Sequence, residues 1–221
     1  KKKWDRLSLA RAQRWSALRV ASAYSTVSGN AVLVIAGRPP IDLLVEERRD
    51  LYDCTGLESE VDMTMRRRQR RFELLHEWQE RWDADHRGRW THKLIPKIEP
   101  WIGRKGGEMG FHLTQLLAGH GCFGEYLHRI GKEATPACYE CGEACDSAEN
   151  TLLSCPEWSE ERRHLGENPD AVSIKKMLLG GAEGVDRLSR FAELVLRKKA
   201  ASGRRRREVE AANNEAAVLN S

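Results

Sequence analysis

Residues 137–158 read A-C-Y-E-C-G-E-A-C-D-S-A-E-N-T-L-L-S-C-P-E-W, and this stretch holds four of the six cysteines of the chain. Cys138 and Cys141 are separated by two residues, a spacing that lets two thiolates bind one metal ion. Cys155 follows later and closes a small loop. Because tetrahedral Zn²⁺ takes four thiolate or imidazole ligands at about 2.0–2.3 Å, the stretch predicts a closed, structural zinc site.

The fourth ligand does not follow from the same spacing. A Cys-Cys-His-Cys knuckle would place a histidine near position 150, where this chain has Asn150, and an amide is a poor ligand for Zn²⁺. Cys145 is the nearest replacement. We therefore predict the ligand set Cys138, Cys141, Cys145 and Cys155. The alternatives for the fourth position are His164, His120 and His128. A weakened knuckle, or cysteines that are simply buried, is the competing interpretation.

The basic residues of the chain are concentrated in short runs. The net charge of the 221 residues is only +4, but residues 66–71 contain five arginines in six positions. Such runs bind phosphates by releasing counterions. We predict phosphate contacts for Arg66, Arg67, Arg68, Arg70 and Arg71, and stacking on a base for Tyr139. The alternative is a solvated helix face, because Glu73, Glu77 and Glu80 follow closely.

Several classes of function are disfavoured by what the sequence lacks. No signal peptide is visible, and no apolar run reaches the roughly 20 residues of a membrane span. The cysteines are therefore expected in a reducing, intracellular compartment, which favours metal over disulfide. There is no phosphate-binding loop, no HExxH motif and no pair of aspartates on a strand-turn. We predict no catalytic residue and no small-molecule substrate.

The hydrophobic pattern predicts a mostly α-helical protein. We expect helices over about 4–28, 31–36, 41–53, 61–87, 111–118, 123–130, 157–165, 173–179 and 184–200. Pro39 and Pro40 open the third of these. Residues 88–108 contain several glycines and prolines and are predicted to be irregular. Beyond Ser202 the composition predicts a frayed helix or disorder.

A resemblance extends over roughly residues 15–200. The motifs that carry it are A-Y-S-T-V-S at 23–28, A-V-L-V-I-A-G-x-P-P-I-D-L at 31–43, W-Q-x-x-W at 78–82, W-T-x-x-L-I-P-x-I at 90–98, Trp101, F-x-L-T-Q-L-L-x-G-H-G-x-F at 111–123, C-x-x-C at 138–141, A-E-N-T-L at 148–152 and C-P-x-W at 155–158. In this order they resemble the region after the polymerase domain of non-LTR (LINE-type) retrotransposon polyproteins. The most similar kind inserts into insect ribosomal DNA.

The resemblance implies a helical thumb-like and linker segment, a zinc-knuckle region and a C-terminal amphipathic helix. In that family a histidine follows the Ala-Glu pair, and Asn150 replaces it here. The implied division is 1–60 for thumb-like helices, 61–108 for a basic helix and linker, 109–168 for the zinc knuckle, 169–202 for C-terminal helices and 203–221 for a basic, disordered tail. The polymerase and endonuclease active sites of the family would precede Lys1, so the chain is expected to be a piece of a longer protein.

The function expected from these observations is to hold template RNA or target DNA during target-primed reverse transcription. The expected partners are RNA or DNA and the rest of a polyprotein, with no membrane, and the expected location is the nucleus after synthesis in the cytoplasm. Two alternatives remain open. One is a zinc-clipped helical module that binds another protein, and the other is a degenerate copy without function.

Overall fold

The structure is a computed structural model that describes residues 2–56, 59–166 and 169–219. These residues form helices and connecting loops, with no strand among them, which confirms the predicted mostly α class. The α-helices are α1 Lys2–Val20, α2 Gly29–Ile35, α3 Ile41–Asp53, α4 Glu60–Ala84, α5 Arg89–Leu94, α6 Ile98–Ile102, α7 Phe111–Ala118, α8 Gly124–Arg129, α9 Ser159–Arg163, α10 Ala171–Leu179 and α11 Ala182–Leu219. A π-helical turn, Asn150–Ser154, and a 3-10 turn, Pro156–Trp158, precede α9.

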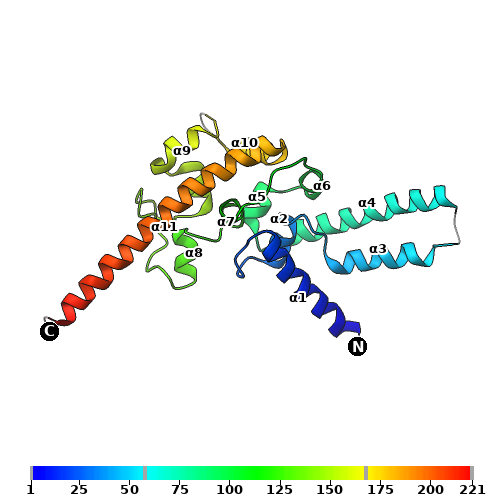
Figure 1. The fold of residues 1–221 in the computed structure, drawn as a ribbon, viewed down its shortest axis with the longest axis horizontal. Helices are drawn as coiled ribbons and strands as arrows, with labels where there is room; N and C mark the ends of the chain where they lie inside the picture. Colours follow the sequence, from blue (N-terminus) through cyan, green and yellow to red (C-terminus); the bar gives the residue numbers. More distant parts are fainter. Residues whose placement is uncertain (1, 57–58, 167–168, 220–221) are drawn as a thin grey trace.

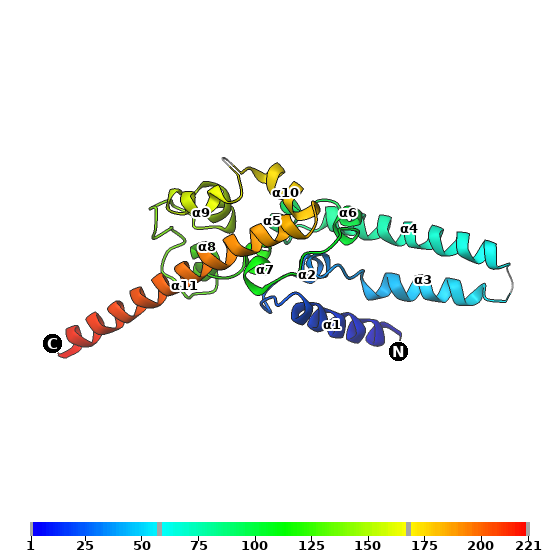
Figure 2. The ribbon, with the colours of Figure 1, turned by 45° about the horizontal axis from the view of Figure 1, so that its top comes forward.

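Helices α3 and α4 form an antiparallel hairpin that extends away from the rest of the molecule (Figures 1 and 2). We call it the hairpin arm. Pro40 precedes α3, and the side chain of Ser59 caps α4 by accepting a hydrogen bond from the Asp62 amide. Such capping satisfies an amide that the helix leaves unpaired. The outer half of the arm is a solvent-exposed pair of helices. The inner half of α4 contributes Leu74, Trp78 and Trp82 to the core.

Buried tryptophans join the base of the arm to the centre of the molecule. Trp78, Trp82 and Trp101 are at most 2% exposed. The indole N–H of Trp82 donates to the Ile95 carbonyl (2.8 Å), and that of Trp101 donates to the Val34 carbonyl (2.6 Å). Each ring thus buries a large apolar surface while its polar atom stays paired. Because these contacts order the segment after α4, residues 88–108 contain the short helices α5 and α6, where we had predicted irregular structure.

The C-terminal part is organised by α11, which packs against α7, α9 and α10. Its apolar stripe, which includes Val185, Leu188 and Val195, is buried. Gly107 lies against this stripe with φ +87°, and a Cβ there would be 2.7 Å from Val185. A side chain at position 107 would therefore both strain the backbone and collide with α11.

Two helix boundaries differ from the sequence-based expectation. Helix α1 ends at Val20 instead of continuing to residue 28, and the side chain of Val20 is 54% exposed. Helix α11 does not fray after Ser202 but continues to Leu219 and projects from the molecule at the C-terminus (Figure 1). No helix in the described ranges combines the length and the apolar character that a membrane crossing requires.

Candidate metal centre and nucleic-acid interface

Three cysteine sulfurs meet inside the C-terminal part. The Sγ atoms of Cys138, Cys141 and Cys155 all lie within 4.8 Å of one another, and Cys138 Sγ is 4.0 Å from Cys155 Sγ. Two thiolates on one tetrahedral Zn²⁺, each about 2.3 Å from the ion, are about 3.8 Å apart. The three side chains therefore form a group that could hold a metal ion with little rearrangement.

The backbone of the loop explains why these sulfurs converge. The Gly142 amide donates to the Cys138 carbonyl, and the Cys138 amide donates to the Glu143 carbonyl, both at 2.8 Å. These two bonds close a tight turn around Cys138 and Cys141. The Cys155 amide donates to the Asn150 carbonyl (2.7 Å) at the end of the π-helical turn. The turn thereby brings Cys155 back to the other two cysteines.

The protonation of the thiols also fits a site that needs a cation. Burial raises the pKa of the Cys138 thiol to about 12 and raises the pKa of Cys155 as well. Both groups are therefore neutral thiols at pH 7 unless a positive ion stabilises their thiolates. A bound metal ion supplies that charge, and its binding would release protons.

Cys145 and the three candidate histidines lie outside this group of sulfurs. Cys145 is exposed, and burial together with Glu125 raises its pKa. His120 and His128 make hydrogen bonds elsewhere, to Thr26 and to the Glu133 carbonyl. Cys145 as the fourth ligand stays a prediction that would require its loop to move. The Oδ1 atom of Asn150 is buried and has no hydrogen-bond partner in the described chain.

A buried ion pair fastens the cysteine loop to α11. Lys199 Nζ lies 2.7 and 2.8 Å from the two carboxylate oxygens of Asp146, and the side chains are only 2% and 6% exposed. Asp146 also accepts hydrogen bonds from the Gly124 amide (2.8 Å) and from the Thr151 hydroxyl (3.3 Å). One carboxylate therefore joins α8, the cysteine loop and α11.

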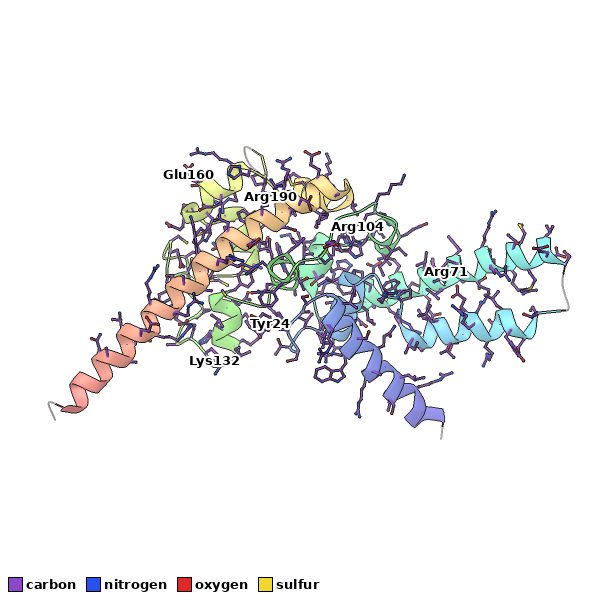
Figure 3. The ribbon with its side chains drawn as sticks, viewed as in Figure 1. Tyr24, Arg71, Arg104, Lys132, Glu160 and Arg190 are labelled. Atoms are coloured by element: carbon purple, nitrogen blue, oxygen red, sulfur yellow. The ribbon has the colours of Figure 1, made fainter. Side chains whose placement is uncertain are left out.

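The arginine run at 66–71 is divided between different sides of the hairpin arm, because successive residues of a helix point about 100° apart. Arg70 pairs with Asp50 and Glu73. Arg71, which Figure 3 labels on the arm, lies 3.0 Å from Glu47, and Glu47 is buried. Both arginines thus link α4 to α3, and Arg70 also makes an ion pair within α4. Their charge is largely compensated within the arm.

The remaining arginines of the run differ in their surroundings. Arg66 lines a cavity that also contains Asp50 and Asp62. Arg67 and Arg68 are exposed, and no ion pair involves either of them among the residues that the structure describes. Arg67 lines a hollow of about 390 Å³ together with Arg48 and Tyr52 of α3. Nothing in the sequence associates Arg48 or Tyr52 with the run, because they lie on a different helix.

Tyr139 projects from the cysteine loop and is 43% exposed. The guanidinium carbon of Arg206 lies 3.6 Å from the centre of its ring, a cation–π contact. Arg206 also pairs with Glu133 (3.3 Å). One face of the ring is therefore occupied by α11, and only the other face could stack on a base as we predicted.

Two positively charged residues that we did not predict lie at the centre of the molecule. Arg89 begins α5 and Arg129 ends α8, and both line the same two neighbouring cavities. They are isolated in the sequence, so no run of charges points to them. His120, which lines both cavities, accepts a hydrogen bond from Arg129 (3.2 Å) and makes another with Thr26 (3.0 Å).

Comparison with known proteins identifies the relatives of this chain. A 115 kDa protein in type-1 retrotransposable element R1DM of Drosophila melanogaster is 33% identical over 220 residues, which cover 87% of this chain. A Retrovirus-related Pol polyprotein from type-1 retrotransposable element R1 of Nasonia vitripennis is 27% identical over 82% of the chain. A second such polyprotein, from Bradysia coprophila, is 35% identical over 40% of the chain.

The chain is a homologue of the insect R1 retrotransposon polyproteins. This confirms the resemblance to non-LTR elements stated above. The R1 homologue spans only part of these relatives, 20% of the Drosophila protein and 50% of the Nasonia polyprotein. No family model matches it, and no solved structure does either.

The His120 network predicts a pH dependence for the stability of the R1 homologue. Burial, and secondarily the charge of Arg129, lowers the pKa of His120 to about 4. In the neutral ring Nε2 accepts from Arg129, so Nδ1 carries the hydrogen and donates to Thr26. The unfolded chain binds this proton with a pKa of about 6.5.

The contribution of His120 is thus complete above about pH 6.5 and is lost as the pH falls from there towards 4. We expect urea unfolding at pH 7.5 and pH 5 to show a smaller pH effect in His120→Gln than in the wild type. His76→Gln, which changes an exposed histidine on α4, is the matched control. Equal pH effects in the wild type and His120→Gln would contradict the assignment of a neutral, buried ring.

Proposed function

We propose that this chain is the nucleic-acid-binding part of a retrotransposon polyprotein, and that it positions template RNA or target DNA for target-primed reverse transcription. Homology to R1 polyproteins supports the parent protein. Copying RNA into chromosomal DNA requires contact with both polynucleotides, and the place of action would be the nucleus. The polymerase and nuclease steps would belong to other parts of such a polyprotein.

The observation that carries this proposal is one side of the hairpin arm. Arg48, Arg67 and Tyr52 line one hollow there, and the Tyr52 side chain is 79% exposed. Arg48 and Arg67 make no ion pair within the described part of the chain. Guanidinium groups bind phosphates, and an exposed aromatic ring stacks on unpaired bases. An arm that carries both groups and extends from the core suits contact with a strand.

The cysteine group has a supporting role in this proposal. We propose Zn²⁺ as its ion, because thiolates select it and a reducing compartment leaves the thiols available. The ion would fix the loop that presents Tyr139, next to the arginines of α11. With Cys145 as its fourth ligand the site would be structural, because four thiolates leave no position for water or substrate.

One observation favours a second candidate, a protein-binding module. Val61, Met65 and Phe72 lie on one stripe of α4 and are 72%, 63% and 62% exposed. Exposed apolar side chains on one helix face are typical of a contact with another protein. This stripe and the Arg67 side are different faces of the arm, so variants can separate the two functions.

The arm proposal is tested by removing its two unpaired arginines together. We expect Arg48→Gln/Arg67→Gln to weaken binding of a labelled single-stranded RNA by roughly tenfold or more. It should also reduce the dependence of log K on log salt by about 1.4 units, because each lost phosphate contact removes about 0.7. Fluorescence anisotropy across a salt series measures both quantities.

The matched control is Arg163→Gln/Arg197→Gln, which removes the same charge from two exposed arginines that pair with acids on their own helices. It should bind nearly as the wild type does. If the arm variant and this control bind equally well, the arm does not contact the strand. Loss of binding to a polyprotein fragment in Met65→Ser/Phe72→Ser would then favour the protein-binding module.

A further inference from the structure

A groove that contains Arg89 and Arg129 runs across the centre of the molecule and borders the cysteine loop at Cys145 and Glu149. Two cavities of about 560 and 480 Å³ share Gly88, Arg89, Ala118, His120 and Arg129 in their walls, so they are continuous. The walls come from α5, α7, α8 and the loops before them. α5 and α7 lie where the hairpin arm meets the C-terminal part (Figures 1 and 2).

The two shared arginines are held in place by neutral groups. Arg89 donates to the carbonyls of Asp83 (3.2 Å) and Asp85 (3.0 Å) and contacts His92 Nδ1 (3.2 Å). Arg129 donates to His120 Nε2 (3.2 Å), and its guanidinium lies 5.5 Å from the centre of the Tyr126 ring. No carboxylate pairs with either arginine in the described ranges.

This arrangement differs from that of several arginines of α4. Arg70, Arg71 and Arg81 each pair with carboxylates, which cancel their charge. Carbonyl and imidazole acceptors orient a guanidinium without cancelling it. Arg89 and Arg129 therefore keep a full positive charge in fixed positions beside a cavity, and a preorganised donor loses little side-chain entropy when it binds an anion.

Gly88 and Trp90 line the groove beside the two arginines. Gly88 has φ +66°, and a Cβ there would lie 2.9 Å from the Cβ of Ala31, so its backbone packs tightly against α2. Trp90 is half-buried, and its indole N–H donates to the Leu116 carbonyl (2.8 Å). The groove thus combines fixed cations with an aromatic edge, the two kinds of group that contact the backbone and the bases of an unpaired strand.

We propose that this groove binds the phosphodiester backbone of a single strand, with one phosphate at Arg89 and another at Arg129. His120 acts as a positioning residue for Arg129, since its neutral ring accepts the guanidinium hydrogen bond. The inference rests on the proposed function and adds a second, central site to the arm. RNA and single-stranded DNA share this backbone chemistry, and the experiment compares the two.

The most direct test adds a charge to the groove instead of removing one. Glu125 lies in the first turn of α8, is exposed, and lines the groove. Glu125→Lys should tighten binding of a labelled 20-nucleotide RNA or DNA by roughly fivefold or more and steepen the salt dependence by about 0.7 units. Glu99→Lys is the matched control, because Glu99 is exposed in the first turn of α6 and lies outside the groove. It should change affinity less than twofold.

The complementary variant is Arg89→Gln/Arg129→Gln, which should weaken binding roughly tenfold per arginine and reduce the salt dependence by about 1.4 units. Circular dichroism checks that it is folded, and Glu125→Lys does not depend on that outcome.

If Glu125→Lys and Glu99→Lys behave alike, the groove proposal is wrong while the arm proposal stands. If the wild type binds neither RNA nor DNA, the proposed function itself is wrong. The strand that binds more tightly identifies the source of the phosphates.

Discussion

Replacement of Lys199 by methionine should lower the free energy of unfolding by about 3–5 kcal/mol, the usual consequence of removing one partner of a buried ion pair. Lys199 Nζ contacts both carboxylate oxygens of Asp146, and both side chains are buried. Methionine fills a similar volume but leaves the carboxylate without its cation. Asp146 cannot simply turn to solvent, because it also holds Gly124 and Thr151.

The measurement is urea unfolding at pH 7, followed by circular dichroism. Lys93→Met is the matched control, because Lys93 pairs with Glu149 and the two side chains are 47% and 44% exposed. Exposed pairs contribute about 0–1 kcal/mol, so this variant should unfold nearly as the wild type does. If Lys199→Met also lost less than 1 kcal/mol, α11 would not be fastened to the cysteine loop as described.

Removal of the proposed zinc ion should have the second large effect on stability. With zinc at about 1,000 times its dissociation constant, binding stabilises the folded state by about 4 kcal/mol, which corresponds to roughly 8–16 °C in Tm for a chain of this size. A chelator should therefore lower Tm by that amount, and Cys155→Ser should do the same without a chelator. Cys54→Ser, which changes a cysteine far from the group in the sequence, should leave Tm nearly unchanged.

Two further variants identify the fourth ligand. Cys145→Ser should weaken zinc binding if Cys145 moves to join the three clustered thiols, and should leave it unchanged if it stays exposed. Asn150→His should tighten binding, because the Oδ1 atom of Asn150 is buried without a hydrogen-bond partner among the described residues and imidazole is the better zinc ligand. Metal analysis of purified protein is the direct measurement. Protein without zinc, whose Tm does not respond to a chelator, would contradict the assignment.

The sequence predicted the elements whose signal is local. Helices α7 and α8 follow from their apolar spacing on either side of Gly119 and Gly121, and α3 follows from Pro39 and Pro40. The three clustered cysteines follow from their spacing. In each case a few neighbouring residues contain the information, so a single sequence is sufficient.

The features that the sequence did not reveal depend on contacts between distant residues. From the sequence alone Arg71 would be available to bind phosphate, but the packing of α3 against α4 places Glu47 beside it. Residues 88–108 have an irregular pattern in the sequence, but the burial of Trp101 and its hydrogen bond to the Val34 carbonyl order the segment. Arg89 and Arg129 are forty positions apart, and only the packing of α5 and α8 around His120 makes them neighbours of one groove.

The central claim is that this chain binds nucleic acid through phosphate contacts, and the salt dependence of binding by the unmodified protein tests it most directly. Four contacts to a single strand, from Arg48, Arg67, Arg89 and Arg129, predict a slope of about −2.8 in log K against log salt. Affinity for a labelled 20-nucleotide RNA should then fall roughly 50-fold between about 50 and 200 mM salt. Binding that changes less than about twofold over that range, or no binding at about 50 mM, would contradict the claim and favour the protein-binding module.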